Sequence, residues 1–445
     1  MSGERLLQKG LIFLTSVIVF IYAFEGIWGT VNPIPYILTG ALAVVIAGSA
    51  FVFGRLYRNI DTLLWAVFFS LAWISTIVNL GVSIDFFLSK FLCTWMMFLA
   101  LYYVVQIIND PKELLKQTFG VYSAGLCFLC LYVLANATAS LNYEIPLHDK
   151  VNGCFLSGRI CALYNANIFA FTCVTLIVSS VFAYLSFCKR IRLLFVFTGI
   201  VGWFCLGLTG CRTGMIGVSL AMGLTVFSEF HAGKLRLGTK SALLKNILPV
   251  LISFLTFLFL LESFMLPVHL YRLVLTVAAN LMGQSDILTN VSSLVIRRIS
   301  DDDGTFSDRT LIWPRGIAQC LKNPRRFLLG ISPLSKEVVS GIYEGHHEIT
   351  APHAHSTYID LLRKHGVLGF ITWMSLLVMW AGIGIRILFD KKESSQIRCL
   401  MASIAGILVM GLVESVPFSY TAWCYTAIPF FLACGYCYRN RSKVR

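Results

Sequence analysis

Two histidines occupy the stretch 353–355, directly before a short amphipathic segment and a long apolar run. The segment HSTYIDLLRKHG predicts a helix that begins after Ser356, a typical N-cap residue, and ends at Gly366. His355 is therefore expected at the helix start, where the positive end of the helix disfavours the imidazolium and leaves a ring that can accept a proton. This position makes His355 a candidate general base; a purely structural role, as a cap or a loop hydrogen bond, is the simpler alternative.

Histidine is frequent around this segment, at His346, His347, His353, His355 and His365. A zinc site needs three or four ligands in compatible geometry, and neither HHE nor HAH has the two-histidine helical spacing of metalloproteases. The acidic run at 301–304 does not fit a calcium loop, because the first and last ligand positions would be Ile299 and Thr310. We therefore expect no metal and no cofactor.

Three other charged residues stand at the edges of apolar segments: Arg159, Arg212 and Glu414. Charges at such positions are costly and usually face a functional cavity, although a side chain that reaches the membrane interface is the alternative. Several arginines around one vestibule favour a phosphate or pyrophosphate ligand, because the guanidinium fork matches that geometry.

The composition is that of a membrane protein. Hydrophobic residues make up 57% of the chain, charged residues only 13%, and the mean hydropathy is +0.77. We expect an all-α polytopic fold of about twelve transmembrane helices with one large, partly helical extracytoplasmic loop. The predicted organisation is nine helices in 1–262, a catalytic loop in 263–365, and three helices with a tail in 366–445. The predicted spans are 8–27, 34–53, 62–80, 86–108, 117–138, 166–187, 192–209, 214–230, 246–262, 366–388, 399–416 and 421–438.

The distribution of basic residues predicts the orientation. Seven segments, which alternate along this map and include both ends of the chain, hold 21 of the 36 lysines and arginines. Basic loops face the cytoplasm, so both termini are expected there, and 139–165 and 263–365 outside. The basic residues are scattered instead of forming one stripe, which argues against a nucleic-acid partner. The N-terminus lacks a small-residue cleavage site, so its first segment is expected to be a retained span. Most cysteines lie in or beside spans, and a Cys154–Cys161 disulfide stays open.

The large loop has helical patterning of its own. In SDRTLIWPRGIAQCLKNP, apolar residues recur at helical spacing, which predicts a helix that begins at Ser307 or Asp308 and stops at Asn323-Pro324. Pro314, in the first two turns, is tolerable there.

The arrangement around His355 resembles the O-antigen ligase and O-antigen polymerase superfamily of membrane glycosyltransferases. The ligase pattern is His, then Asn, Ser or Gln, nine residues, and Gly-x-x-Gly. His355-Ser356, residues 357–365 and Gly366-Val-Leu-Gly369 match it without a gap. The ligases' usual two threonines after the second glycine are replaced by Phe370-Ile371, which leaves ligase and polymerase both open.

Four other elements carry the same resemblance. CRTG at 211–214 is similar to the family's Ser-Arg-Thr-Gly turn, and DRTLIW resembles its Arg-x-x-x-Trp motif through Arg309 and Trp313. GRICALYNANIFA resembles its Arg…Asn-Pro-Asn element through Arg159 and Asn167, with alanine in place of proline. Glu414 corresponds to a carboxylate near the end of the penultimate span. The resemblance covers roughly residues 150–420.

The resemblance implies a metal-independent transfer of a polyprenyl-pyrophosphate-linked glycan to a hydroxyl of a glycan or lipid-linked glycan acceptor. It implies that Arg212, Arg309 and Arg159 bind the donor pyrophosphate, and that His355 acts as the base of an inverting attack. Glu414, Ser356, Trp313 and Asn167 would support the site. Such enzymes build cell-envelope polysaccharides, such as capsule or lipopolysaccharide, at the outer face of the cytoplasmic membrane.

A twelve-helix transporter or flippase of lipid-linked glycans is the main alternative. It predicts two related halves, a substrate site near the bilayer midplane and broken central helices. The sequence has no recognisable similarity between its halves and one dominant loop, so we favour transfer.

Overall fold

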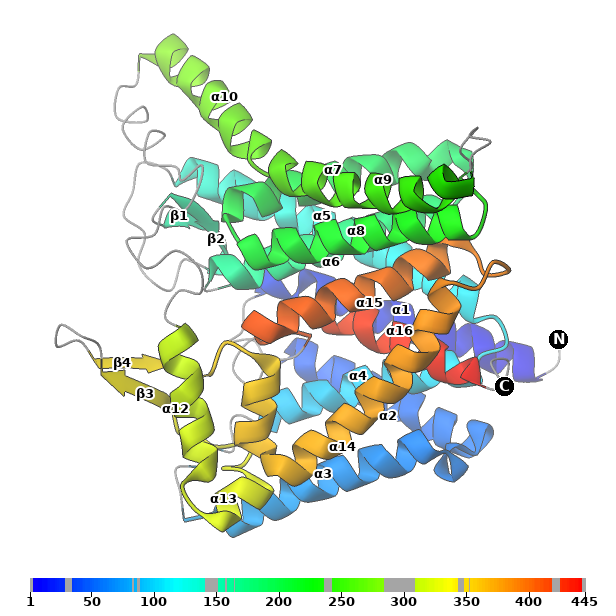
Figure 1. The fold of residues 1–445 in the computed structure, drawn as a ribbon, viewed down its shortest axis with the longest axis vertical. Coiled ribbons are helices and arrows are strands. Elements are labelled where there is room, and N and C mark those ends of the chain that lie inside the picture. The colour runs from blue at the N-terminus through cyan, green and yellow to red at the C-terminus, as the bar shows by residue number, and fades with distance from the viewer. Residues whose placement is uncertain are drawn as a thin grey trace. The chain divides into compact units, whose positions relative to one another are not determined.

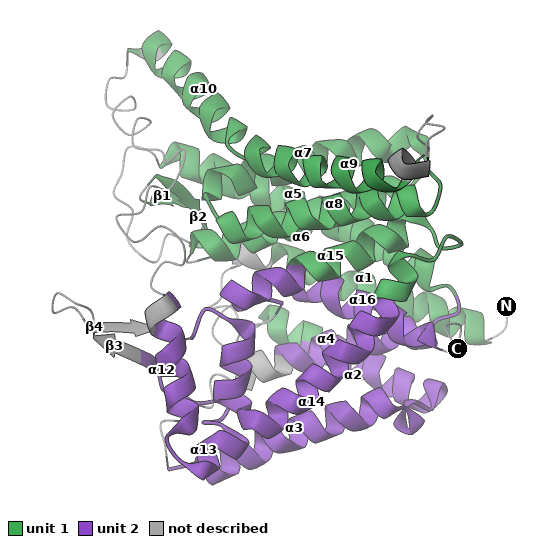
Figure 2. Cartoon of the chain, in the orientation of Figure 1, with its two compact units in different colours: residues 1–39, 110–298, 385–406 green, residues 40–109, 299–384, 407–445 purple. Residues whose placement is uncertain are grey.

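The structure is a computed structural model of the 445-residue chain. It is almost wholly helical (Figure 1). Contacts divide the chain into two compact units, which Figure 2 shows in different colours. Unit 1 comprises residues 1–39, 110–298 and 385–406, and unit 2 comprises 40–109, 299–384 and 407–445. The described residues are 3–28, 34–81, 84–85, 89–140, 151–156, 158–163, 165–235, 242–283, 309–342, 348–351, 353–417 and 425–441.

A helix is present at each of the twelve predicted spans. Within the described ranges, ten helical stretches are long and apolar enough to cross a membrane. The predicted span 86–108 corresponds to α4 (Ser89–Ile107), whose apolar part Thr94–Ile107 is shorter, and 421–438 corresponds to the 13-residue α16 (Ala427–Arg439). The chain is therefore an all-α polytopic membrane protein.

Unit 1 is organised around α6, which packs against α5, α7 and α8. Buried hydroxyl groups link three of these helices: Ser123 Oγ lies 3.0 Å from Ser180 Oγ and 2.9 Å from Thr198 Oγ1. Such hydrogen bonds join helices where no water competes for the polar groups. Its elements are α1 (Gly3–Trp28), α5 (Pro111–Ala139), β1 (Cys154–Leu156), β2 (Arg159–Cys161), α6 (Ala166–Ser186), α7 (Lys189–Thr209), α8 (Arg212–His231), α9 (Ala242–Ser263) and α10 (Leu266–Met282).

Unit 2 has an aromatic core. Trp65 of α3 lies 5.7 Å from Trp373 and 6.0 Å from Trp380, both on α14, between ring centroids, and all three are at most 2% exposed. Its elements are η1 (Leu56–Arg58), α3 (Ile60–Val78), α4, α12 (Arg309–Leu321), α13 (Pro324–Leu329), β3 (Val339–Ile342), β4 (Glu348–Ala351) and α16. The division falls within α2 (Ile34–Gly54), α14 (Thr357–Leu388) and α15 (Ser395–Val413), which contribute residues to both units.

The loop predicted at 263–365 contains more structure than its sequence suggested. It begins with α10, and its later part holds the antiparallel pair β3–β4, with Val339 opposite Ala351. The predicted helix of this loop is α12, whose expected start at Ser307 or Asp308 lies outside the described residues. The expected stop at Asn323-Pro324 is confirmed, because α12 ends at Leu321, but the same two residues also begin α13, a helix that the sequence did not predict. The Asn323 side chain accepts a hydrogen bond from Arg326 N at 2.9 Å, and proline is well tolerated in a first turn.

Gly366 breaks α14, as the sequence predicts. Its φ of 64° and ψ of −175° are non-helical and are essentially restricted to glycine. The break is where two backbones cross: a Cβ on Gly366 would lie 2.5 Å from Gly330 N, and one on Gly330 would lie 2.5 Å from Lys364 O. Ile331 N and Ser332 N donate to the carbonyls of Arg363 and Lys364 there.

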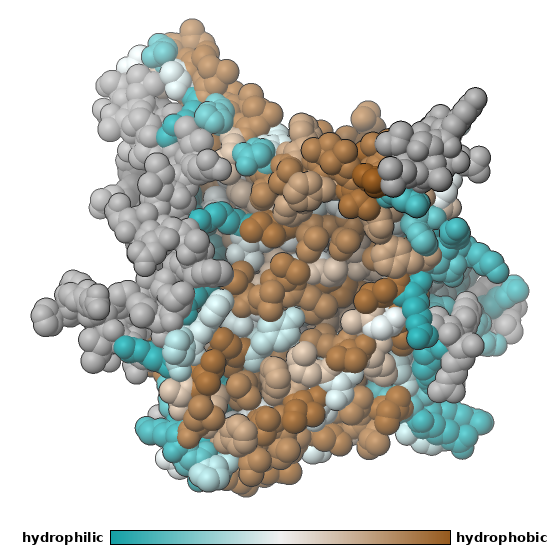
Figure 3. Space-filling view, in the orientation of Figure 1, coloured by the Kyte–Doolittle hydropathy of each residue, from teal (hydrophilic) through white to brown (hydrophobic). Residues whose placement is uncertain are grey.

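Apolar side chains cover the outward faces of the helices, and hydrophilic residues gather near the helix ends (Figure 3). Phe13, Val44, Leu193 and Phe259 are among the exposed large hydrophobic residues, each at least 67% exposed. This distribution is the one expected of helices in contact with lipid.

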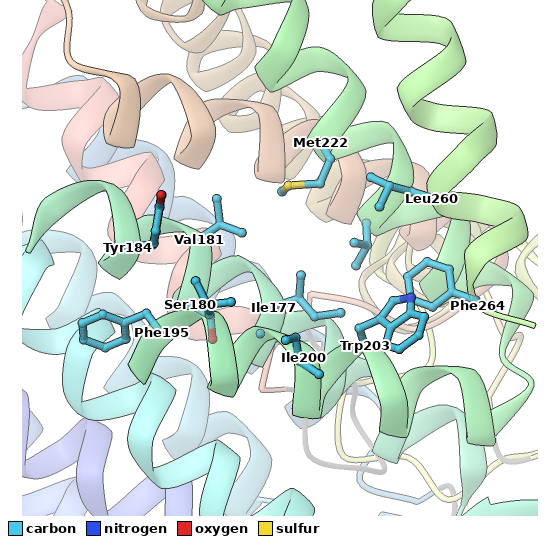
Figure 4. Close-up of a pocket in the computed structure, with 13 residues that line it drawn as sticks. Ile177, Ser180, Val181, Tyr184, Phe195, Ile200, Trp203, Met222, Leu260 and Phe264 are labelled. Atoms are coloured by element: carbon cyan, nitrogen blue, oxygen red, sulfur yellow. The ribbon is translucent and has the colours of Figure 1, made fainter. Parts of the chain in front are cut away.

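Unit 1 also contains an apolar cavity of about 350 Å³ among α6, α7, α8 and α9 (Figure 4). Ile177, Trp203, Met222 and Phe264 are among the side chains that line it. The hydroxyl of Ser180, the one serine in the lining, donates to Leu176 O at 2.7 Å.

Candidate active site

The segment 353–355 is fixed just before α14. Ala354 is completely buried, its N–H donates to Asp360 Oδ1 at 2.8 Å, and its carbonyl accepts from Trp313 Nε1 at 3.0 Å. His355 has a φ of 50°, in the left-handed region that non-glycine residues rarely adopt. Its position at the helix start confirms the expected placement. The Ser356 carbonyl accepts the Asp360 N–H at 2.9 Å, so Ser356 stands directly before the first turn, as expected of the N-cap.

Glu414 joins two of the predicted site residues. It follows the last residue of α15, and only 5% of its side chain is exposed. Its Oε2 lies 3.5 Å from His355 Nδ1, and its Oε1 pairs with the Arg309 guanidinium. Arg309 Nε also donates to Val413 O at 2.7 Å. Unit 2 therefore brings together an imidazole, a carboxylate and a guanidinium, the groups needed to hold and move one proton.

Arg309 and Trp313 both belong to α12 and are four residues apart, so they share one helix face. Arg309 contacts the 413–414 segment, and Trp313 contacts Ala354. One face of α12 thus touches both segments that supply the site. The four-residue spacing of Arg309 and Trp313 in the sequence therefore lets both side chains reach the site.

His353 is packed beside His355, with 4.1 Å between their ring centroids. Burial, with a smaller contribution from the His355 ring, lowers the pKa of His353 to about 3. A neutral His353 suits the hydrogen bond that His355 N donates to His353 Nδ1 at 3.2 Å. His353 is therefore a support for the His355 backbone.

The other histidines of the cluster do not join this pair within the described residues. His365 is buried in unit 2 and stacks on Phe68, with ring centroids 4.5 Å apart, and His346 and His347 fall outside the described ranges. In the part of the chain that the structure describes, no group of three or more His, Cys, Asp or Glu side chains is arranged to hold a metal ion.

Unit 1 holds the remaining predicted residues in a second cluster. Arg159, on β2, donates to Asn167 Oδ1 at 2.9 Å and to Thr209 O at 2.6 Å. Thr209 ends α7, and after Gly210 (φ 59°) and Cys211 the next helix begins at Arg212, which is exposed. A Cβ on Gly210 would lie 3.5 Å from Arg159 Nε, so this turn packs directly on Arg159.

The hairpin that carries Arg159 pairs Cys154 with Cys161 across β1 and β2, and both cysteines are buried and reduced. The disulfide that the sequence left open is therefore not formed. The two cysteines pack with Ala166 in a small apolar cluster at the start of α6.

Two residues of the unit 2 cluster were missed from the sequence. Asp360 and Ser415 hydrogen-bond to each other, Ser415 Oγ to Asp360 Oδ2 at 2.9 Å, although 55 residues separate them. The available signal was a charged residue, Asp360, among the apolar residues of the first turns of a short helix. Ser415 carries no recognisable signal beyond its place next to Glu414.

A family model matches part of the chain. Residues 197–374 match the family model described as O-antigen ligase, a range that includes Arg212, Arg309, Trp313 and His355. Arg159, Asn167 and Glu414 fall outside it. No curated protein matches the sequence. Residues 197–374 are thus similar to the O-antigen ligase domain, which supports the O-antigen ligase and polymerase superfamily and a role in glycan transfer at a membrane.

Proposed function

We propose that the protein transfers a glycan from a polyprenyl-pyrophosphate donor to a hydroxyl of a glycan or lipid-linked glycan acceptor, with inversion and without a metal. The reaction is of the surface-polysaccharide polymerase or O-antigen ligase type. The observation that carries the proposal is the contact of His355 Nδ1 with the Glu414 carboxylate at 3.5 Å, beside Arg309.

The proton chemistry follows from that contact. A carboxylate at Nδ1 favours the tautomer that carries its proton there, so Nε2 keeps the lone pair that a general base needs. Nε2 takes the proton of the acceptor hydroxyl as its oxygen attacks the anomeric carbon. The bond from that carbon to the pyrophosphate oxygen breaks, and polyprenyl pyrophosphate leaves with the electron pair. Glu414 stabilises the imidazolium that forms.

The arginines supply charge for the leaving group. Negative charge grows on the pyrophosphate as the bond breaks, and preorganised donors are most effective where such charge develops. Arg309 is the arginine beside His355, and its charge is shared with Glu414. From the family resemblance we also propose that Arg212 and Arg159 bind the donor pyrophosphate, with Asn167 holding Arg159.

The apolar cavity of unit 1 suits the donor's polyprenyl chain. The helices α7 and α8 line it and also flank the turn before Arg212. Trp203 is six residues before the end of α7 and Val218 is six residues after Arg212, which at 1.5 Å per residue puts both about 9 Å along their helices from the turn. An arginine at the turn followed by an apolar cavity suits an amphiphile with an anionic head group and a long apolar chain.

The proposal also fixes an orientation, with both termini cytoplasmic and residues 263–365 on the opposite face of the cytoplasmic membrane. The alternation of basic segments along the sequence supports it. Cysteine labelling at introduced sites tests it: Gly304→Cys should react with an impermeant reagent added from outside, and Ser394→Cys only after the membrane is opened. A Gly304→Cys protein labelled only from the cytoplasm contradicts the orientation.

Purified protein in detergent provides the test of function, because a micelle has no second compartment and a transporter would leave the substrate unchanged. Incubation with a polyprenyl-pyrophosphate-linked repeat unit should give longer lipid-linked glycans or a glycosylated second acceptor, together with free polyprenyl pyrophosphate. The new linkage should be inverted, and a chelator should leave the rate unchanged. A donor with a truncated chain should show a higher KM. A donor that binds and is never consumed, whatever acceptor is supplied, contradicts the proposal.

A further inference from the structure

Ala354, between the two histidines, is held from both sides by side chains. The carboxylate of Asp360 accepts its N–H, and the indole of Trp313 donates to its carbonyl. His355 follows with a φ of 50°, a conformation that costs free energy and persists only where surrounding contacts impose it. The contacts to Ala354 are therefore the restraint on the backbone that carries the proposed base.

The second oxygen of Asp360 reaches the other half of the site. Its Oδ2 accepts from Ser415 Oγ at 2.9 Å, and Ser415 is the neighbour of Glu414. Thr357 adds three hydrogen bonds to the same backbone segment: its N donates to Glu414 O at 3.1 Å, and its Oγ1 lies 3.2 Å from Glu414 O and 2.6 Å from Val416 O. The Asp360 side chain is thus bonded to both segments, those of His355 and of Glu414.

Asp360 is itself firmly held. It is 3% exposed, and Arg363, which is fully buried, donates to its Oδ1 at 3.2 Å and also to the carbonyl of Glu337. A buried carboxylate is expensive unless it is paired and hydrogen-bonded, and Asp360 meets that condition with three different donors. A buried carboxylate held by three donors keeps the groups that donate to it at fixed distances.

A helix cap explains only part of this arrangement. The bond to Ala354 N ties down the start of α14, but a cap does not require the bond to Ser415, which belongs to a segment 55 residues away. The hydrogen bond between Asp360 and Ser415 joins the segments of His355 and Glu414. The separation of these segments decides whether His355 Nδ1 contacts Glu414 Oε2.

We propose that Asp360 is a positioning residue that sets the distance between His355 and Glu414. The proposal rests on the proposed function, in which His355 is the base. Asp360 does not touch the reacting atoms; it acts through the two segments that it joins. Its loss therefore lowers the rate of proton transfer and leaves donor binding in place.

Two variants test this in the purified protein, with transfer measured per folded molecule. Asp360→Asn keeps the size of the side chain and removes its charge. Ser415→Ala removes the bond from Asp360 towards the Glu414 segment, together with the 3.4 Å contact of Ser415 Oγ with His353 Nδ1, and leaves the Asp360–Arg363 pair intact. We expect both to lower kcat, Asp360→Asn by up to about 10²-fold, the order of the cost of a misplaced catalytic group, and both to leave the donor KM unchanged. Asp85→Asn, the same substitution in the same unit at an ion pair with Lys336, is the control and should retain the wild-type kcat.

A double-mutant cycle separates positioning from a general structural role. If Asp360 acts through His355, Asp360→Asn should cause no further loss in a His355→Ala background, because the group it positions is gone. An equal fold-loss in both backgrounds, or wild-type kcat in both single variants, overturns the proposal. If Asp360→Asn does not fold, Ser415→Ala alone decides between these results. A His355→Ala protein with full activity instead contradicts the proposed function, and the positioning role falls with it.

Discussion

Glu414 is the residue of unit 2 that contacts both Arg309 and His355. Its two oxygens face different partners, Arg309 on one side and His355 on the other. The pair with Arg309 gives the carboxylate a charged partner in a largely buried place, where an unpaired charge would be costly. The other carboxylate oxygen is the acceptor that suits Nδ1–H of His355. We therefore assign two roles to Arg309: it stabilises charge on the leaving group, and it pairs with the Glu414 carboxylate.

Replacing Glu414 tests this double role. Glu414→Gln keeps an acceptor for Nδ1–H but removes the charge that stabilises an imidazolium, so kcat should fall. The fall should be smaller than that for loss of the base itself, which is ~10²–10⁴-fold. Steady-state kinetics of the purified variant give the value.

Glu337→Gln is the matched control, because it removes a carboxylate from Arg326, at 2.8 Å, in the same unit. Its kcat should be that of the wild type. Equal rates for Glu414→Gln and wild type would remove Glu414 from the mechanism.

At the scale of elements, the site depends on a helix that is interrupted. The first part of α14 holds Asp360, and its second part is the membrane span that the sequence predicts from residue 366. The break at Gly366 lets the 330–332 backbone approach within hydrogen-bonding distance of the carbonyls of Arg363 and Lys364. Together with α12, this crossing fixes the short helix that stands between the membrane span and His355.

Gly366→Ala should destabilise this crossing. The substitution strains a backbone conformation available mainly to glycine, which alone costs on the order of 1–3 kcal/mol, and its Cβ would lie 2.5 Å from Gly330 N. The thermal unfolding midpoint in detergent should fall, and transfer should fall with it.

Gly382→Ala is the control on the same helix, because nothing lies within 4 Å of its Cβ position. It should match or exceed the wild-type midpoint, since alanine favours helix more than glycine does. A Gly366→Ala protein as stable as Gly382→Ala would show that the crossing contributes little.

At the scale of the whole molecule, the features that the sequence predicted are those with a local signal. Membrane spans follow from continuous hydropathy, and the end of the helix at Gly366 follows from glycine chemistry. The start of α13 was missed because Asn323-Pro324 is compatible both with ending one helix and with beginning another. Local pattern does not decide between them.

The partners within the site could not be predicted from spacing. Glu414 lies 105 residues from Arg309 and 59 from His355, and such pairs are set by how helices pack, which no local pattern encodes. The resemblance to a family named Arg309, His355 and Glu414 separately. It gave no sign that Asp360 and Ser415 hold two of them together.

The role of His355 as the base is best tested by the rate of transfer by purified His355→Ala protein in detergent, with donor binding measured alongside. We predict a fall in kcat of ~10²–10⁴-fold with donor affinity near that of the wild type. His269→Ala, at an exposed histidine of α10, should keep the full rate. Transfer by His355→Ala at the wild-type rate would contradict the account, as would inhibition of the wild-type enzyme by a chelator that added zinc reverses.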